Sequence, residues 1–271
     1  MSKLFLMAGT KGGIGKSLVA SLLADMAFDR KYRPVLFDCD DENRTFSRAY
    51  GNAGTDYLVF EMSMKGKGRK VFPLDSVVNK IVKTERDKKH FPGENAFIID
   101  MKAGTSADTM QWLKRFPFGD LKAIDIESNI VGIVTAEIDS VVTLAPWLKE
   151  YLGANIDSQV RFSVIKNEVA GDDFSFYNKK MSGLFSVAKV KCQTCKLIDW
   201  GDQYQKLIQG KDSSFGRVAT GRTKIEDFGF MDDYRLRMYY KETCEEFAPL
   251  FDSIAPVQTS EIREEISDGA K

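Results

Sequence analysis

The sequence has little of several features that define common protein classes. Each shortage argues against one or more of these classes. Its charges cancel, since 39 Lys and Arg stand against 39 Asp and Glu. No global field therefore draws the chain onto nucleic acid or anionic lipid, and any such binding must be local. No run of about 18 apolar residues occurs, and segment 1–8 is too short for the apolar core of a secretory signal. We expect a cytoplasmic protein without a membrane-spanning helix.

Cysteine and histidine are also scarce. Four cysteines in 271 residues do not form a disulfide framework, and a reducing compartment would keep them as thiols. Cys192 and Cys195 have the spacing of half a zinc site, but tetrahedral zinc needs four ligands, which only a dimer would supply. His90 is the single histidine. It lies in a charged stretch with no nucleophile motif, so we favour a solvated surface residue over a catalytic base.

Strand-like and helix-like patterns alternate along most of the sequence. Short β-type runs alternate with longer helical patterns, which is typical of βαβ units and a mostly parallel sheet. The runs are nearly continuous in apolar residues, as expected for strands covered on both faces. They lie at 3–8, 34–37, 96–99, 129–135 and 159–166, with a weaker one at 186–191. We predict an α/β, doubly wound domain over 1–255, with helices on both faces, and a disordered acidic tail at 256–271.

Apolar residues at helical spacing predict the helices between these strands. One helix follows the first glycine-rich loop, another covers about 142–151, and a last one covers 232–251. Asp232 or Asp233 is the expected N-cap of the last helix.

The first strand leads into the glycine-rich segment 11–17, KGGIGKS. In a P-loop, glycines let backbone N–H groups approach phosphate oxygens, a lysine contacts the outer phosphates and a hydroxyl binds Mg²⁺. Lys16 and Ser17 fit the last two roles. Thr10 occupies the place of the usual first glycine, so the assignment depends on the strand before the loop and the helix after it. The expected phosphate-binding residues are Gly12, Gly13, Ile14, Gly15, Lys16, Ser17 and Leu18.

Lys11 completes the pattern KGGxGK[ST], and with it the sequence resembles the ParA/MinD superfamily of deviant Walker A ATPases. The resemblance implies a P-loop NTPase fold, ATP and Mg²⁺ as ligands, and a homodimer that forms face to face with ATP. It also implies that Lys11 acts in trans, where its charge stabilises the transferring phosphoryl group as an arginine finger does. The expected catalytic residues are Lys11, Lys16 and Asp40.

Acidic residues also lie at the ends of two further predicted strands. The resemblance to the ParA/MinD superfamily implies a function for each of them. It implies that Asp40 positions or activates the attacking water and that Asp38 supports Mg²⁺ and the loop. Ordinary loop acidity is the alternative, and Asp41 and Glu42 leave the assignment open. Asp100 ends an apolar run that resembles a Walker B strand, whose carboxylate holds a Mg²⁺-bound water.

The second switch departs from the family pattern. Lys102 stands where the family commonly has proline, before Ala103 and Gly104, so we expect this switch to differ in conformation or timing. Gly104 remains the expected γ-phosphate contact. Asn167 matches the asparagine with which such proteins hydrogen-bond adenine, and an Asx-turn residue is the alternative.

The last third of the sequence contains several basic residues that could form a local DNA-binding patch. A solvated charged face is the simpler alternative. The basic residues are Lys179, Lys180, Lys189, Lys191, Lys196, Arg217, Arg222 and Lys224. The acidic end of the chain argues against a direct membrane anchor of the MinD type.

We predict a slow ATPase that dimerises with ATP, responds to a stimulating adaptor protein and positions or segregates a cargo, as in plasmid partition, stability or conjugal transfer. One alternative is a metabolic ligase of the dethiobiotin-synthetase type, which would need an acceptor pocket. Another is a targeting ATPase with a zinc-bridged dimer through Cys192 and Cys195. An interaction protein with an inactive site is disfavoured by Lys16, Ser17 and the acidic residues.

Overall fold

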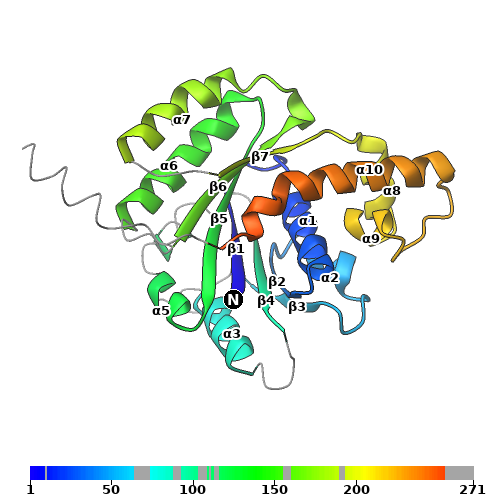
Figure 1. The fold of residues 1–271 in the computed structure, drawn as a ribbon, viewed down its shortest axis with the longest axis horizontal. Coiled ribbons are helices and arrows are strands. Elements are labelled where there is room, and N and C mark those ends of the chain that lie inside the picture. The colour runs from blue at the N-terminus through cyan, green and yellow to red at the C-terminus, as the bar shows by residue number, and fades with distance from the viewer. Residues whose placement is uncertain are drawn as a thin grey trace, which may run out of the picture.

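The computed structural model describes residues 1–9, 11–63, 74–87, 93–102, 109, 111–112, 116–154, 160–188 and 193–253. Within these residues, seven strands form one sheet in the order β3-β2-β4-β1-β5-β6-β7 (Figure 1). Every pair of neighbouring strands is parallel. The strands are β1 (Ser2–Ala8), β2 (Arg33–Cys39), β3 (Leu58–Glu61), β4 (Asn95–Met101), β5 (Ile126–Val134), β6 (Val160–Asn167) and β7 (Gln193–Leu197). The predicted α/β, doubly wound fold is confirmed.

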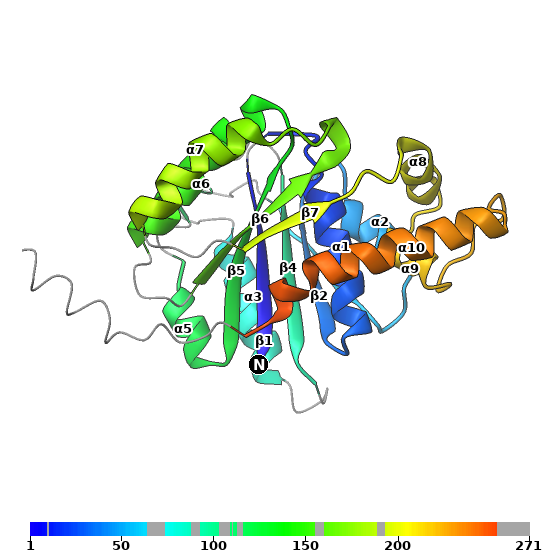
Figure 2. The same cartoon turned by 45° about the horizontal axis from the view of Figure 1, so that its top comes forward.

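Successive side chains along the strands pack alternately into two separate hydrophobic cores. On β1, Phe5 and Met7 belong to one core, whereas Leu4 and Leu6 belong to the other. All four are at most 1% exposed. Successive strand residues point to opposite faces, so a strand that is apolar at nearly every position must be covered on both sides. The prediction of helices on both faces is therefore confirmed (Figure 2).

Different helices cover the two faces. The first core includes residues of α1 (Lys16–Asp29), α2 (Thr45–Tyr50), α8 (Asp202–Gly210), α9 (Phe215–Ala219) and α10 (Phe230–Phe247). The second includes residues of α3 (Asp75–Arg86), α5 (Phe118–Ala123), α6 (Ile138–Ala154) and α7 (Ser175–Ala188). Figure 1 shows α6 and α7 on one side of the sheet and α1 and α10 on the other. Two 3₁₀ turns, η2 (Glu168–Ala170) and η3 (Ala248–Phe251), follow β6 and α10.

Three elements differ from what the sequence predicted. Residues 186–188 of the weak strand predicted at 186–191 belong to α7, which has Tyr177 and Met181 buried at helical spacing, and residues 189–191 lie outside the described residues. The strand that the structure shows in this part of the chain is β7. Strand β3 was missed. It has four residues and pairs only with β2 at the edge of the sheet, so its side chains are only partly buried and leave a weak pattern.

The start of the last helix also differs from the prediction. Helix α10 begins at Phe230, with Gly229 as its N-cap. Asp232 is the third helical residue, and its carboxylate accepts a hydrogen bond from the backbone N–H of Gly229 at 3.0 Å. Asp232 therefore caps the helix from within, as in a capping box, and is not the N-cap residue.

The topology brings the ends of several strands to one edge of the sheet. Strand β1 lies between β4 and β5, where the strand order reverses, and this is where open α/β sheets bind ligands. The register of β2 and β4 places Asp38 opposite Asp100. Within the described residues, no helix is long and apolar enough to cross a membrane.

Candidate functional site

The loop between β1 and α1 owes its shape to glycine. Gly13 and Gly15 have φ angles of 75° and 92°, a region that side chains other than glycine disfavour. Gly15 is also the N-cap of α1. A Cβ atom at Gly15 would lie 2.5 Å from Nδ2 of Asn167, so there is no room for a side chain. The loop therefore brings backbone N–H groups and a helix N-terminus together, which is an arrangement suited to a phosphate.

Lys16 lies at the centre of this loop. Its side chain is buried, and Nζ donates a hydrogen bond to the carbonyl oxygen of Lys11 at 2.6 Å. Burial lowers the pKa of Lys16, while the charges of Asp100 and Asp40 oppose that shift. A cation that is already partly dehydrated and held in place can bind a phosphate oxygen with little further loss of hydration.

Asp100 lies behind the loop with its carboxylate buried and 1% of the residue exposed. Burial raises the pKa of Asp100 to about 7, and the Ser17 hydroxyl and the Lys16 charge lower it in part. Within the described residues, neither carboxylate oxygen has a hydrogen-bond partner of good geometry. A buried carboxylate without such a partner, near a serine hydroxyl, offers the hard oxygen donors that Mg²⁺ prefers. The residues present therefore fit a Mg²⁺ ion.

Asp38 and Asp40 have different surroundings although they are two residues apart. Asp38 is fully buried and accepts hydrogen bonds from the backbone N–H groups of Ser47 at 3.0 Å and Asp40 at 3.4 Å. Asp40 lies at the surface of the cavity described below. Its carboxylate accepts from the backbone N–H of Glu42 at 3.0 Å and from the side chain of Asn43 at 2.8 Å. Burial opposes ionisation of Asp40, but these hydrogen bonds outweigh it and lower the pKa.

Lys102 joins the ends of two neighbouring strands. Its ammonium group forms an ion pair with Glu42 and lies 3.5 Å from Oδ1 of Asp41. Both acidic residues follow Asp40 in the loop after β2, whereas Lys102 directly follows β4. The residue that departs from the family pattern therefore holds the loop that carries Asp40.

Lys11 forms an ion pair within the same chain. Its ammonium group forms an ion pair with the carboxylate of Glu137, which lies between β5 and α6. The two side chains are 27% and 55% exposed, so the pair lies at the surface.

A cavity of about 330 Å³ opens beside the loop. At one end it is lined by Gly12, Gly13, Gly15, Lys16, Ser17 and Leu18. Asp40, Asn43, Thr45 and Arg48 line the side formed by the loop after β2 and by α2. Trp200, Gln205, Gln209, Ser213 and Phe215 line the far end. Most of the residues predicted to bind phosphate thus line one cavity. Ile14 is not among the lining residues, and its side chain is in the core.

Asn167 lies at the end of β6 with 4% of the residue exposed. Its amide nitrogen donates to the carbonyl oxygen of Ile14 at 3.1 Å, and its amide oxygen accepts from the backbone N–H of Val169 at 3.2 Å. The contact with Val169 is that of an Asx-turn, which was the alternative to an adenine contact. The adenine contact of Asn167 stays a prediction. Gly104, the expected γ-phosphate contact, lies outside the described residues.

The other sequence hypotheses concern metal and DNA. Cys192 and His90 lie outside the described residues, and Cys195 is buried in the first core, where burial raises its thiol pKa to about 12. Among the residues that the structure covers, no group of three His, Cys, Asp or Glu side chains is placed to hold a metal ion. Zinc at this pair remains an untested hypothesis.

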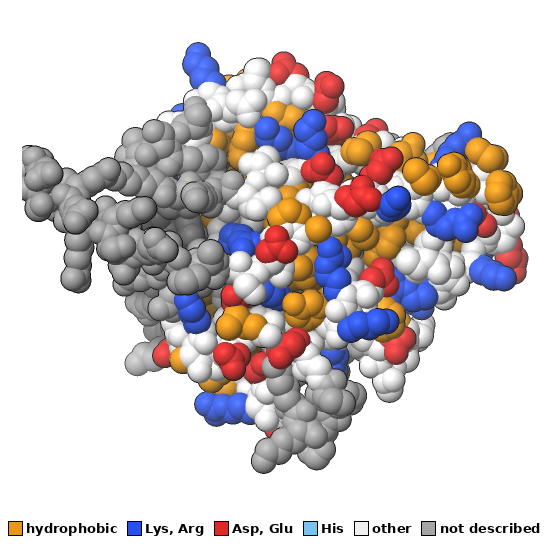
Figure 3. Space-filling view, in the orientation of Figure 1, with side chains coloured by type: hydrophobic (Ala, Val, Ile, Leu, Met, Phe, Trp, Pro, Cys, Tyr) orange, Lys and Arg blue, Asp and Glu red, His pale blue; other side chains and the backbone are white. Residues whose placement is uncertain are grey.

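The basic residues of the last third do not share one environment. Arg217 donates to the carbonyl oxygen of Ala49 at 2.8 Å, and Arg222 lies 3.1 Å from Asp29. Lys179 and Lys180 are exposed on α7, on the opposite side of the sheet, whereas Lys189 and Lys191 lie outside the described residues. On the face shown in Figure 3, Lys and Arg are interspersed with Asp and Glu. DNA binding stays a prediction.

Glu137 and the cavity wall formed by α8 and α9 were not predicted from the sequence. Glu137 follows a strand at the same edge of the sheet as Asp100, and this position was a usable signal. Gln205, Gln209 and Ser213 carried no such signal, because only the packing of α8 and α9 against α1 brings them to the loop.

Neither a protein-family model nor a curated protein matches the sequence. Solved structures match by fold. The MinD cell division protein of Aquifex aeolicus superposes with a TM-score of 0.51 at 11% identity, covering 94% of this chain and 99% of that one. A chain of the MinC:MinD cell division protein complex of Aquifex aeolicus gives 0.50 at 12% identity, with 94% and 98% coverage. A plasmid partition protein from Borrelia burgdorferi gives 0.48 at 14%, with 92% and 99% coverage. The two superpositions with a TM-score of 0.50 or more show that the chain shares the fold of MinD over nearly its whole length.

Proposed function

We propose that this chain is an ATPase that hydrolyses ATP to ADP and phosphate and uses the nucleotide to switch between monomer and dimer. One observation carries the proposal. Buried Lys16 and the buried, unpartnered carboxylate of Asp100 meet at a glycine loop that opens into a cavity. A buried cation and a buried anion at the same loop are costly for folding alone. A phosphate bound there would give the Lys16 ammonium, which now donates only to a neutral carbonyl oxygen in the described residues, a charged partner, and a cation would do the same for Asp100.

Each residue of the site has a role in the proposed reaction that follows from its position. Backbone N–H groups of the loop bind phosphate oxygens, and Lys16 neutralises the outer phosphates. Ser17 and Asp100 would hold Mg²⁺, directly or through water, and Mg²⁺ bound there supplies charge stabilisation to the phosphates. Asp38 fixes the loop after β2 through Ser47. Asp40, which lines the cavity, would orient the attacking water once its carboxylate turns from its own loop toward the phosphates.

The dimer is the switch. Lys11 lies at the surface next to the loop, from where its side chain can reach a nucleotide bound to a second subunit. The chain shares its fold with MinD, which was solved in a complex with MinC. This supports a protein adaptor as the partner. We extend the proposal to the positioning or segregation of a cargo, with plasmid partition, stability or conjugal transfer as the candidate settings. Fold alone does not fix that role.

Nucleotide titrations of the purified chain test the core of the proposal. The wild type should bind ATP with Mg²⁺ and release phosphate slowly. Lys16→Ala removes the charge on the outer phosphates and should weaken ATP binding by at least about tenfold. Lys206→Ala, which removes an exposed lysine on α8, is the matched control and should bind as the wild type does. Equal ATP affinity in Lys16→Ala and wild type would refute the site.

A further inference from the structure

Helix α10 has apolar side chains on its outer side. They lie in its first half, where Phe230 is 75% exposed, Met231 50%, Tyr234 47% and Met238 39%. None of these four residues lines the cavity beside the glycine loop. In Figure 3, hydrophobic side chains gather over the end of α10 that projects at the right of Figure 1. Single exposed apolar residues are ordinary, but four adjoining ones on one helix indicate a docking surface.

The spacing of the four residues puts them in one stripe along the helix. Phe230, Tyr234 and Met238 are four residues apart, and Met231 comes three residues before Tyr234. Residues three and four apart are neighbours on a helix surface, so these side chains adjoin. The opposite side of α10 packs into the first core, where Leu236 is fully buried. We call the exposed stripe the α10 face.

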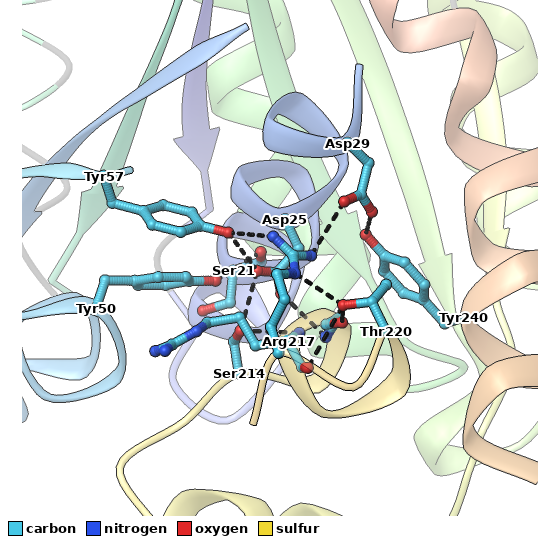
Figure 4. A network of polar contacts seen from close by, with 11 residues as sticks. Ser21, Asp25, Asp29, Tyr50, Tyr57, Ser214, Arg217, Thr220 and Tyr240 are labelled. Carbon is cyan, nitrogen blue, oxygen red and sulfur yellow. Dashed lines mark hydrogen bonds and ion pairs between the residues drawn. The ribbon is translucent and has the colours of Figure 1, made fainter. Parts of the chain in front are cut away.

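Hydrogen bonds to other helices hold α10 in place, so the α10 face has a fixed orientation. The hydroxyl of Tyr240 on α10 donates to the carboxylate of Asp29 on α1 at 2.7 Å (Figure 4). At the beginning of α10, the hydroxyl of Tyr204 on α8 donates to Asp232 at 2.9 Å. A preformed surface loses little conformational entropy when it docks.

Charged residues along one edge of the α10 face decide which occupant fits it. Asp233 and Arg237 are exposed on this edge and lie four residues apart, one helical turn from each other. Nε of Arg237 donates to the backbone carbonyl oxygen of Asp233 at 3.3 Å. On the other edge, Arg235 lies 4.0 Å from Asp232 of its own helix. An edge with one negative and one positive end is complementary to a copy of itself that runs in the opposite direction.

A second α10 in antiparallel orientation would match this edge twice. In a two-fold contact, residue i of one copy faces residue j of the other, and residue j faces residue i. With the axis midway between Asp233 and Arg237, Asp233 of each copy faces Arg237 of the other. At about 1.5 Å of rise per residue, the same axis brings the two Tyr234 side chains to within about 3 Å along the helix direction. Met231 of one copy then lies at nearly the same level as Met238 of the other.

We propose that the α10 face binds a second copy of this chain through an antiparallel, two-fold contact between the two α10 helices. Met231, Tyr234 and Met238 form the apolar centre of the contact. Two ion pairs between Asp233 and Arg237 set its direction and register. The contact uses neither the glycine loop nor Lys11, so it does not rest on the proposed function and forms with or without ATP. One helix face per subunit is a small interface, and we expect weak, concentration-dependent association.

Sedimentation of the full chain at increasing concentration, without nucleotide, measures this contact. The wild type should associate as its concentration rises. Met238→Asp should weaken association by at least about tenfold, because it puts an unpaired charge into the apolar centre. Its circular dichroism should match the wild type, because the side chain lies at the surface of the single subunit. Arg86→Asp changes an exposed charge on α3, which packs on the other face of the sheet. It is the control for charge and should associate as the wild type does.

Charge reversal along the edge tests the direction and register of the two helices. In the two-fold contact, Asp233→Arg sets arginine against arginine, and Arg237→Asp sets aspartate against aspartate. Each variant alone should therefore associate about tenfold more weakly than the wild type. Mixed in equal amounts, the two variants should regain this factor, because positions 233 and 237 carry opposite charges across the mixed pair. Damage to the fold cannot produce such a recovery.

Three results would overturn this inference. A wild type that stays monomeric up to about 1 mM would leave the α10 face to a different occupant. Charge variants that associate no better together than apart would exclude the two-fold register. Association that appears only with ATP and is lost in Lys11→Ala would place the contact at the glycine loop. That last result would support the proposed function while it contradicts the contact through α10.

Discussion

The ammonium group of Lys11 forms an ion pair with Glu137 of the same subunit. If Lys11 acts across a dimer, this pair must open before the lysine can reach the other nucleotide. Exposed ion pairs contribute only about 0–1 kcal/mol. Phosphates carry more charge than one carboxylate, so the exchange is favourable and Glu137 does not prevent action in trans.

The first prediction concerns Lys11→Ala. The variant should bind ATP nearly as the wild type does, because Lys16 and the loop remain, but it should dimerise and turn over poorly. Loss of each charge-assisted contact should weaken the dimer by about ten- to a hundredfold. Sedimentation with ATP and assays of phosphate release measure the two effects.

A mixture of subunits tests whether Lys11 acts in trans. Lys11→Ala and Asp40→Ala subunits are each inactive by the proposal. A mixed dimer has one site in which an intact Asp40 faces an intact Lys11 from the other subunit, and that site should recover activity. If mixed dimers form and the mixture stays inactive, Lys11 works within its own subunit.

Asp40→Asn is the second prediction. The carboxylate lies at the cavity surface and is held by Asn43 and Glu42, so it contributes little to holding ATP in the ground state. Turnover should fall by about 100-fold or more, as expected for loss of a group that directs water, while ATP binding changes by less than about fivefold. The trapped ATP-bound dimer should accumulate on a sizing column. Equal losses in binding and turnover would instead make Asp40 a structural or Mg²⁺ residue.

Lys102→Ala is the third prediction. Its ion pair with Glu42 and its contact with Asp41 connect β4 to the loop that carries Asp40. Loss of the lysine should leave the loop less fixed and slow turnover by up to about fivefold, with ATP binding unchanged, because the pair is at the surface. The charge reversal Lys102→Glu combined with Glu42→Lys should recover part of the rate. No recovery, together with normal folding by circular dichroism, would count against this positioning role.

Asp25 provides the fourth prediction, which concerns stability. Burial raises the pKa of Asp25 to about 6, and the contacts from Ser214 and Gly216 and the charge of Arg222 lower it in part. The folded chain keeps this proton at pH values where the unfolded chain, with the ordinary pKa of 3.8, has lost it. The free energy of unfolding should therefore fall as the pH rises from about 4 to about 6.

Urea unfolding at two pH values measures this effect. Between about pH 5 and pH 7 the wild type should lose roughly 1 kcal/mol relative to Asp25→Asn, which cannot titrate. Comparison with the variant cancels the contribution of other titrating groups, Asp100 among them. A constant difference between the two proteins across this range would show that Asp25 does not titrate there.

The sequence by itself determined much of the fold. Continuous apolar runs such as 96–99 required cover on both faces, and their alternation with helices allowed few topologies. The glycine loop and the acidic residues at strand ends could be placed because parallel strands bring their carboxyl ends to one edge. Local sequence patterns did not predict the secondary structure where side chains are only partly buried, as in β3. They also failed where the spacing of apolar residues fits both a strand and a helix, as around 186–191.

Only the tertiary structure decided what surrounds the loop. Ser213 and Gln209 lie nearly 200 positions from Lys16, and they reach its cavity because Asp25 holds α9 against α1. The pairing of Lys11 with Glu137 likewise depends on the ordering of β1 beside β5. Such contacts depend on long-range packing, which leaves no periodicity or motif in the sequence. The sequence therefore predicted the phosphate loop, whereas only the tertiary structure showed the other walls of the cavity beside it.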